Sequence, residues 1–240
     1  MSPDDIESVE GFRARARPFV REHLPSRHPD EPRFMSMAEA KTLQASIFDA
    51  GFAGIAVPAI YGGAGLTLQH QKVWAEEVEE HEVPDPLFVS IGMLGITLLD
   101  EGSELLKRRH IPKILRGEEV WIQLLSEPSG GSDMAAVMTR ATCDGETWVL
   151  KGSKIWSTGA DEADYGMCLA RTDWDAPKHK GLSMFAVPLN DPNLTIEPII
   201  GIDGGQPHFF QEWLDDLVLP AENLIGAENS GWSVAHTPVS

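Results

Sequence analysis

The residues best suited to chemistry lie in two stretches of the second half of the chain. The first runs from Gln123 to Asp133 and reads QLLSEPSGGSD. It leaves a predicted strand, turns at Pro128 and then offers consecutive glycine amides with hydroxyls on both sides. Because glycine has no Cβ, such a loop can bring backbone N–H groups close to a phosphate or a planar ring. On the residues alone, an ordinary turn after a strand is the favoured interpretation.

The second stretch runs from Lys151 to Ala160 and reads KGSKIWSTGA. Trp156 can lie against a planar ring, with the hydroxyls of Ser157 and Thr158 directed at the polar edge of that ring. Packing of Trp156 in the core is the alternative, and the residues alone favour it. On the residues alone, the two stretches favour an ordinary turn and a core tryptophan, and a binding site for a planar, polar-edged ligand is the alternative.

Helices are expected to carry the first half of the chain, up to about Gly117, because apolar residues recur there at helical spacing. We expect the first helix to start with Ser2 as N-cap and Pro3 at the first helical position. A capping box between Ser36 and Glu39 predicts the start of a second helix, which ends at Gly51. Further helices are expected over residues 67–82 and 88–99, with short helical pieces up to residue 115.

Strands are expected from Val120 onward, where the apolar period changes to about 2. Asp144-Gly145 predicts a hairpin with a type I′ turn. The expected strands cover residues 141–143, 147–150, 154–158, 165–171, 182–188, 195–199 and 209–219. Many short antiparallel strands are typical of a barrel or sandwich.

Composition excludes several classes of function. The 19 Lys and Arg against 37 Asp and Glu give a formal net charge of −18, which would repel nucleic acid. The two cysteines, Cys143 and Cys168, make no disulfide framework, so we expect a reducing, cytoplasmic compartment. The longest apolar stretch, residues 87–99, is too short for a membrane helix, and the acidic N-terminus does not resemble an export signal.

Other chemistry-bearing residues favour structural interpretations. The acidic run of Glu76, Glu77, Glu79, Glu80 and Glu82 is expected to be a solvated helix face. His70 and His81 do not have the spacing of metal ligands, and we predict no metal site. The basic cluster of Lys107, Arg108, Arg109 and Lys113 is expected to lie at a helix end, where it balances the helix dipole.

The order of three motifs carries a family resemblance. QLLSEPSGGSD, then WVLKGSKIWSTGADEADYGMCLART, then DDLVLPAENLIGAENSGW closely resemble the middle domain of acyl-CoA dehydrogenases, and the AGIAVPAIYGGAGLT loop resembles their N-terminal domain more loosely. The resemblance implies an α+β fold, in which an N-terminal helical domain (1–118) precedes an antiparallel β-barrel (119–226). Residues 227–240 would begin the family's C-terminal four-helix bundle, which is otherwise missing.

The resemblance also implies a flavin site. Gln123, Leu125, Ser126, Gly131 and Ser132 would line FAD and the adjacent acyl-CoA entrance, with Ser132 also touching substrate. Trp156, Ser157 and Thr158 would lie beside the isoalloxazine ring, and Ser126 and Thr158 are the hydroxyls expected to hydrogen-bond it. In the implied reaction a base removes the proton α to the thioester while hydride leaves the β carbon for the flavin. The family's base is a bundle glutamate with no counterpart here, so we assign no catalytic residue.

Three functions stay open. The first is FAD-dependent dehydrogenation of an acyl-CoA in lipid catabolism, in a tetramer or another homo- or hetero-oligomer, with electron-transfer flavoprotein as acceptor. The second is a catalytically silent fragment or structural subunit of such a complex. The third is an oxidase of the same fold that passes electrons to oxygen. The chain ends at Ser240, and Pro238 lies where the first long helix of the bundle would begin.

Overall fold

A computed structural model describes residues 6–28, 34–202, 204–205 and 207–237. The chain divides into two compact units, which are named here by their content. The helical unit comprises residues 1–91 and 108–118, and the sheet unit comprises residues 92–107 and 119–240. The predicted domain limits at residues 118/119 and 226/227 stay a proposal. Within the described residues, no helix combines the length and the apolar character needed to span a membrane.

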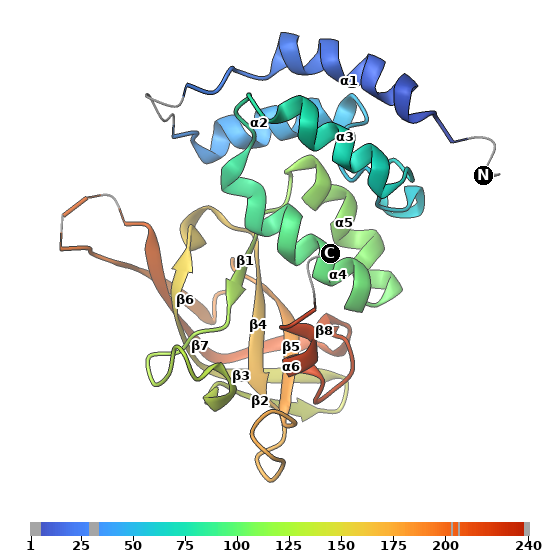
Figure 1. Ribbon diagram of the computed structural model, residues 1–240. Helices are drawn as coiled ribbons and strands as arrows, with labels where there is room; N and C mark the ends of the chain where they lie inside the picture. Colours follow the sequence, from blue (N-terminus) through green and yellow to red (C-terminus); the bar gives the residue numbers. More distant parts are fainter. Residues whose placement is uncertain (1–5, 29–33, 203, 206, 238–240) are drawn as a thin grey trace. The chain divides into compact units, whose positions relative to one another are not determined.

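Helix α1 (Val9–His23) begins later than the sequence predicted (Figure 1). Residues 6–8 are not helical, and the side chain of Ser8 caps the helix by accepting from the Gly11 amide at 3.1 Å. The expected cap, Ser2, and the expected first helical residue, Pro3, lie outside the described residues. The correction follows from capping chemistry, since a serine eight residues into the chain serves as well as one at its start.

Helix α2 (Met37–Asp49) confirms the predicted capping box. The Glu39 amide donates to Ser36 Oγ at 3.3 Å, and the Ser36 amide donates to Glu39 Oε2 at 3.0 Å. Gly51 follows the helix with φ of 79°, the left-handed conformation expected after a helix end. Helix α3 (Leu68–Val78) starts after Thr67 as predicted and ends four residues before the expected Glu82.

The later helical segments differ from the prediction in helix type and in length. Residues 88–99 do not form one α-helix: a π-helical segment (Val89–Leu94) leads into the short helix α4 (Gly95–Glu101). Helix α5 (Glu104–Arg116) is continuous where only short pieces were expected. Its last turn carries Lys113 and Arg116, while residues 107–109 lie in its first half. The basic cluster therefore does not sit at a helix end as a whole.

Packing of the helical unit follows the apolar stripe that predicted α1. Phe12, Ala16 and Val20 of α1 are buried with Ile47 of α2 and Val73 of α3. These side chains form one core cluster, which supplies most of the stability that the short helices lack by themselves.

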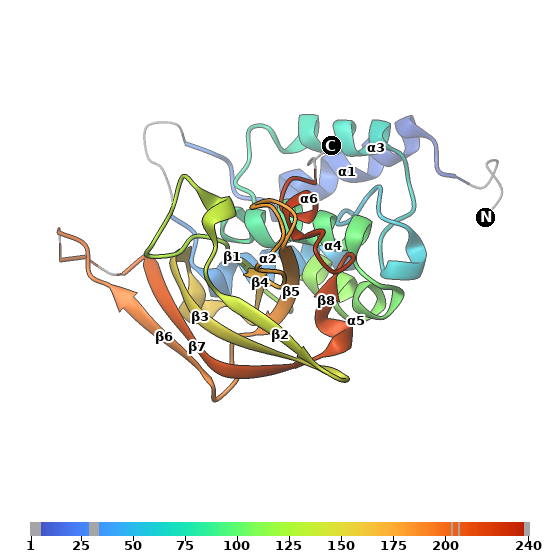
Figure 2. The same ribbon diagram turned by 90° about the horizontal axis from the view of Figure 1, so that it is seen from below.

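The described residues of the sheet unit form eight strands, which Figures 1 and 2 show as one curved sheet. They are β1 (Trp121–Leu124), β2 (Arg140–Asp144), β3 (Thr147–Thr158), β4 (Tyr165–Arg171), β5 (Leu182–Pro188), β6 (Leu194–Ile199), β7 (Phe209–Pro220) and β8 (Leu224–Ile225). Their order is β6-β7-β3-β2-β4-β5-β8, with β1 paired to β4 off this path. The two pairings of β4 with β1 and β2 are parallel and the others are antiparallel. Helices followed by a mostly antiparallel sheet confirm the predicted class.

Two details of the strands correct the sequence analysis. The segments expected at 147–150 and 154–158 form the single strand β3, which pairs with β7 along its length. The hairpin between β2 and β3 is confirmed, but its two loop residues are Gly145 and Glu146. Of these only Gly145 has positive φ, 65°, so the turn is not type I′, which requires positive φ at both positions.

The interior of the sheet unit is built from side chains of several strands. Leu150 of β3, Ala170 of β4, Phe185 of β5 and Leu217 of β7 are fully buried members of its core cluster. After β8 the described chain ends in the short helix α6 (Gly231–Val234). Pro238, the expected start of a long helix, lies outside the described residues.

Candidate functional site

A carboxylate at the start of the glycine-rich segment ties that segment to its own far end. We call residues 127–139 the glycine loop. Glu127 Oε2 accepts from the Met138 amide at 2.6 Å and Glu127 Oε1 accepts from the Thr139 amide at 2.9 Å. The amide of Gly130 donates to the carbonyl of Glu127 at 3.0 Å, which closes the turn through Pro128. One buried side chain therefore fixes both ends of the loop.

Lys154 of β3 holds this carboxylate from inside the sheet. Its Nζ donates to Glu127 Oε1 at 2.8 Å, to the carbonyl of Leu169 at 2.6 Å and to the carbonyl of Leu125 at 3.4 Å. The Lys154 side chain is 0% exposed and that of Glu127 is 4% exposed. Burial alone would raise the pKa of Glu127, but the Lys154 ammonium and the hydrogen bonds to the carboxylate hold that pKa below its ordinary value.

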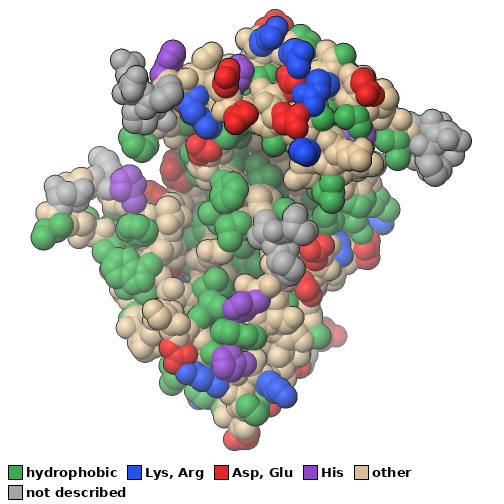
Figure 3. Space-filling model, viewed as in Figure 1, with side chains coloured by type: hydrophobic (Ala, Val, Ile, Leu, Met, Phe, Trp, Pro, Cys, Tyr) green, Lys and Arg blue, Asp and Glu red, His purple; other side chains and the backbone are tan. Residues whose placement is uncertain are grey.

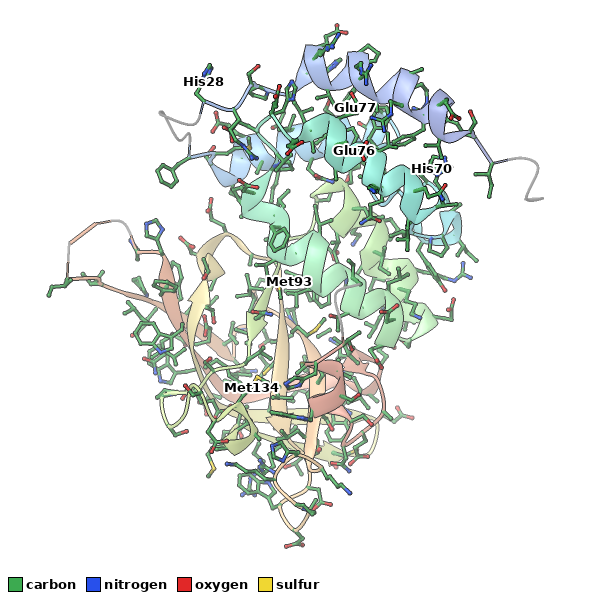
Figure 4. The ribbon with its side chains drawn as sticks, in the orientation of Figure 1. His28, His70, Glu76, Glu77, Met93 and Met134 are labelled. Atoms are coloured by element: carbon green, nitrogen blue, oxygen red, sulfur yellow. The ribbon has the colours of Figure 1, made fainter. Side chains whose placement is uncertain are left out.

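The far side of the glycine loop is held by two further cations. Buried Arg171 donates to the carbonyl of Ala135 at 2.7 Å and to that of Val137 at 3.0 Å. Lys178, which is partly exposed, forms an ion pair with Asp133. Figure 4 labels Met134 in the short 3₁₀ helix (Met134–Ala136) between these contacts. The tip of the loop stays open, because no atom lies within 4 Å of where a Cβ on Gly131 would be.

Trp156 lies at a β-bulge beside this loop. The register between β3 and β7 shifts between Ile155 and Ser157, which leaves Trp156 out of the pairing, and its φ is 69°. Such bulges re-aim side chains. Trp156 is 56% exposed, so the interpretation that placed it in the core is wrong. Its ring meets that of Phe209 edge to face, with 6.0 Å between centroids.

The bulge also links the two sequence stretches. The amide of Ile155 donates to the carbonyl of Ser126 at 3.0 Å, so the end of β1 lies directly beside the bulged part of β3. Beyond the bulge, Thr158 is exposed like Trp156, two residues earlier. The structure therefore brings Ser126 beside the bulge that carries Trp156, and the glycine loop begins at the next residue, Glu127.

Ser157 points into the sheet instead. It is 4% exposed, and its hydroxyl donates to Glu212 Oε2 of β7 at 2.9 Å. Among the described residues, Glu212 Oε1 has no hydrogen-bond partner, although Glu212 is 0% exposed. Burial raises the pKa of Glu212 to about 7, against the opposing effects of the Ser157 hydroxyl and the Lys154 charge. The hydroxyl of Ser157 is thus directed away from the face that carries Trp156.

Gln123 and Leu125 line a small cavity of about 50 Å³ within the sheet unit. The other lining side chains are largely apolar and include Met93, Met167 and Met184, with Thr97 as a polar member. Figure 4 labels Met93 on the π-helical segment. Methionine is flexible and polarizable, so such walls adapt to the shape of an apolar group.

The competing signals of the helical unit are structural. Glu77 is not on a solvated face as expected: its side chain is 9% exposed and pairs with Arg13 and Arg17 of α1 (Figure 4). Buried His70 lies within hydrogen-bond distance of Thr67 Oγ1 and the Glu7 carbonyl, and so supports the start of α3. In the part of the chain that the structure describes, no cluster of three or more His, Cys, Asp or Glu could hold a metal ion.

Family models agree with the motifs and with the fold. Residues 7–118 match the acyl-CoA dehydrogenase N-terminal domain, and residues 123–211 match the acyl-CoA dehydrogenase middle domain. The chain belongs to the acyl-CoA dehydrogenase family.

Relatives within the family are similar over most of this chain. It is 37% identical to acyl-CoA dehydrogenase FadE34 of Mycobacterium tuberculosis over 82% of the chain and 27% of that protein. It is 32% identical to acyl-CoA dehydrogenase IpdE1 of the same organism, over 96% of the chain and 62% of the relative. The solved structure of the Tcur3481-Tcur3483 steroid ACAD superimposes with a TM-score of 0.75 at 29% identity, covering 99% of this chain and 61% of that one. The chain thus spans less than two thirds of the relatives it matches.

The exposed groups fit the flavin nucleotide that the family implies. The exposed indole of Trp156 lies at the bulge and exposed Thr158 follows two residues later, while the glycine loop, which begins one residue after Ser126, carries the open Gly131 and the exposed Ser132. Aromatic faces accept planar rings, and turn amides with hydroxyls accept phosphate oxygens. The eight predicted contact residues remain predictions, with Ser157 directed inward.

Sequence reasoning missed the charged residues that build the site from within. Glu127, Lys154 and Arg171 all lie inside the quoted motifs, yet we gave them no role. The available signal for Lys154 was a charge followed directly by strand-forming apolar residues, as in Lys154-Ile155-Trp156. A charge in such a position is buried and needs a partner.

Proposed function

We propose that this chain forms the flavin-binding and substrate-facing part of an acyl-CoA dehydrogenase, which converts an acyl-CoA thioester to a trans-2-enoyl-CoA. The observation that supports the proposal most is Trp156, held out of the core by a bulge whose Ile155 amide is bonded to Ser126, one residue before the glycine loop. A non-glycine residue at positive φ costs stability, and such strained positions cluster at functional sites. FAD, when bound, would supply the acceptor for the hydride that leaves the β carbon.

The residues of this chain would bind and orient. Trp156 would offer a flat face to the ring, and Ser126 and Thr158 would hydrogen-bond the polar atoms of the ring. Gly131 and Ser132 would hold phosphate oxygens through amide and hydroxyl groups. Water would be excluded on the side that Leu125 and Met167 line. No described residue is assigned as the base that takes the α proton.

The acyl group is proposed to approach the cavity lined by Gln123, Leu125 and Met93. Its volume of about 50 Å³ is several times the roughly 10–15 Å³ that one water needs by the same measure, so it admits a small apolar group. A cyclohexane-1-carbonyl-CoA dehydrogenase of Syntrophus aciditrophicus is 34% identical over 79% of this chain and 50% of that protein. A ring-bearing acyl group is therefore a specific substrate to compare with straight chains.

A second candidate is a subunit that turns over substrate only with a different partner chain. Two similar structures carry paired names, the Tcur3481-Tcur3483 steroid ACAD and, at 26% identity and a TM-score of 0.73, the ChsE4-ChsE5 complex from Mycobacterium tuberculosis. The oligomeric state, the cytoplasmic location and electron-transfer flavoprotein as electron acceptor also remain proposals.

Anaerobic titration of the FAD-loaded protein with straight-chain acyl-CoAs and cyclohexane-1-carbonyl-CoA tests the proposal. Loss of the visible flavin absorbance with one of them is expected. Bound flavin that no acyl-CoA bleaches, until a partner chain is added, would instead support the second candidate. Rapid reoxidation by air after bleaching would identify an oxidase.

A further inference from the structure

The ion pair between Lys154 and Glu127 is an unusual way to hold a loop. Taking two charges out of water carries a large desolvation cost, and well-packed apolar residues commonly replace such pairs without loss of stability. Both side chains are almost completely buried, at 0% and 4% exposure. Stability alone therefore does not account for the pair.

The positions that the Lys154–Glu127 pair fixes account for its presence better than stability does. The carboxylate of Glu127 joins the amides of Met138 and Thr139 to the start of the glycine loop, and Lys154 joins that carboxylate to β3 and to the Leu169 carbonyl of β4. These are directional, charge-assisted bonds, which fix positions more narrowly than apolar contacts do. Two residues after Lys154 stands Trp156, and the intervening Ile155 amide bonds the Ser126 carbonyl.

We propose that Lys154 and Glu127 are positioning residues, which hold the open glycine turn at a fixed place relative to Trp156. This inference rests on the proposed flavin function and adds the pair that sets the geometry of the site. Neither residue touches the ligand: Glu127 acts through Gly131 and Ser132, and Lys154 acts through Glu127. Arg171 and Lys178 restrain the other side of the loop, so loss of the pair frees one side only.

The test is a neutral pair variant, Lys154→Met with Glu127→Gln, which leaves no charge buried alone. Its control is Lys151→Met on the same strand, because Lys151 is 59% exposed and pairs only at the surface with Asp215 and Asp216. FAD binding is followed by flavin fluorescence, and the absorbance bands of bound FAD report the surroundings of the ring. Hydrogen exchange of amides 129–137 in the ligand-free protein reports the order of the loop.

For the pair variant we expect an FAD dissociation constant raised roughly 10-fold or more, since sites loosen when their supporting groups are removed. Bound flavin bands should shift, and the loop amides should exchange faster while those of β4 and β5 keep their protection. The Lys151→Met control should match the parent in all three readouts.

Equal dissociation constants, bands and loop exchange in pair variant and parent would overturn the inference while leaving the flavin function intact. A parent protein that binds no FAD would overturn the proposed function, and the positioning role with it. Loss of protection throughout the sheet, without a selective effect on the loop, would show that the pair serves the fold alone and would also overturn the inference.

Discussion

The helical unit and the sheet unit place their charges differently. In the helical unit, Arg13 and Arg17 meet Glu77 at the solvent edge of α1 and α3, and Figure 3 shows acidic and basic side chains mixed on this surface. In the sheet unit, Lys154 and Glu127 meet with almost no exposure, and Glu212 is buried beside them. Exposed ion pairs contribute little to stability. Burying an ion pair carries a desolvation cost, which its attraction and its hydrogen bonds have to offset. On this ground we propose that the functional part of the chain lies in the sheet unit.

The largest expected effect separates two lysines of β3. Lys154→Met should lower the free energy of unfolding by about 3–5 kcal/mol, because it leaves the Glu127 charge buried without its partner. Lys151→Met should lower it by less than about 1 kcal/mol, because Lys151 and its partners are exposed. Urea unfolding of both variants measures the comparison. Similar losses would mean that the two positions do not differ in the way that their burial indicates.

Glu212 provides a pH-dependent contrast. Burial raises the pKa of Glu212 from 4.5 to about 7, so between these values the folded protein holds a proton that the unfolded chain has released. The contribution of Glu212 to stability is therefore fully present below about pH 4.5, falls as pH rises and levels off above about 7. Glu212→Gln should match the parent near pH 4.5 and exceed its stability at pH 8 by up to about 3 kcal/mol.

The control for this contrast is Glu197→Gln on β6, where the carboxylate is exposed. Because this side chain lies in solvent, the substitution should change the free energy of unfolding by less than about 0.5 kcal/mol. The free energy of unfolding is measured at several pH values for both variants and the parent. A constant difference between Glu212→Gln and the parent across this range would show that burial does not hold this carboxyl neutral.

The smallest expected effect lies in the helical unit. Hydrogen bonds from Arg17 and Arg13 lower the pKa of Glu77 to about 2, with burial opposing them. Glu77→Gln should cost about 1 kcal/mol at pH 7, since both arginines are partly in solvent, and its difference from the parent should shrink as pH falls from 4.5 toward 2. Glu76→Gln, at a more exposed position, should cost less. Thermal unfolding ranks the two, and the reverse order would contradict the account.

Local rules predicted much of this structure. The Ser36 capping box and the strands at 165–171 and 182–188 follow from residues within one turn or one alternation period. Those rules could not predict the bulge at Trp156, because strict alternation from buried Lys154 places Trp156 in the core. The exposure of Trp156 depends on the register between β3 and β7 and on the hydrogen bond from the Ile155 amide to the Ser126 carbonyl. Neither contact is local in the sequence.

The candidate site shows the same division. A resemblance to known motifs named the exposed residues, but the partners of Glu127 lie 11, 12 and 27 residues away and only the fold brings them together. For the same reason Ser157 could be assigned to the ring by its neighbours in sequence, while its hydroxyl reaches Glu212, 55 residues on. Residue spacing is enough to identify the glycine loop, whereas the residues that hold the loop can be identified only from the tertiary structure.

Direct FAD binding tests the central claim, that the bulge and the glycine loop of the sheet unit form a flavin site. Flavin emission is titrated with the parent protein and with Trp156→Leu, whose exposed side chain can be changed without disturbing the core. We predict saturable quenching by the parent and much weaker quenching by the variant. Unchanged flavin emission with the parent, or equal quenching by both proteins, would contradict the claim.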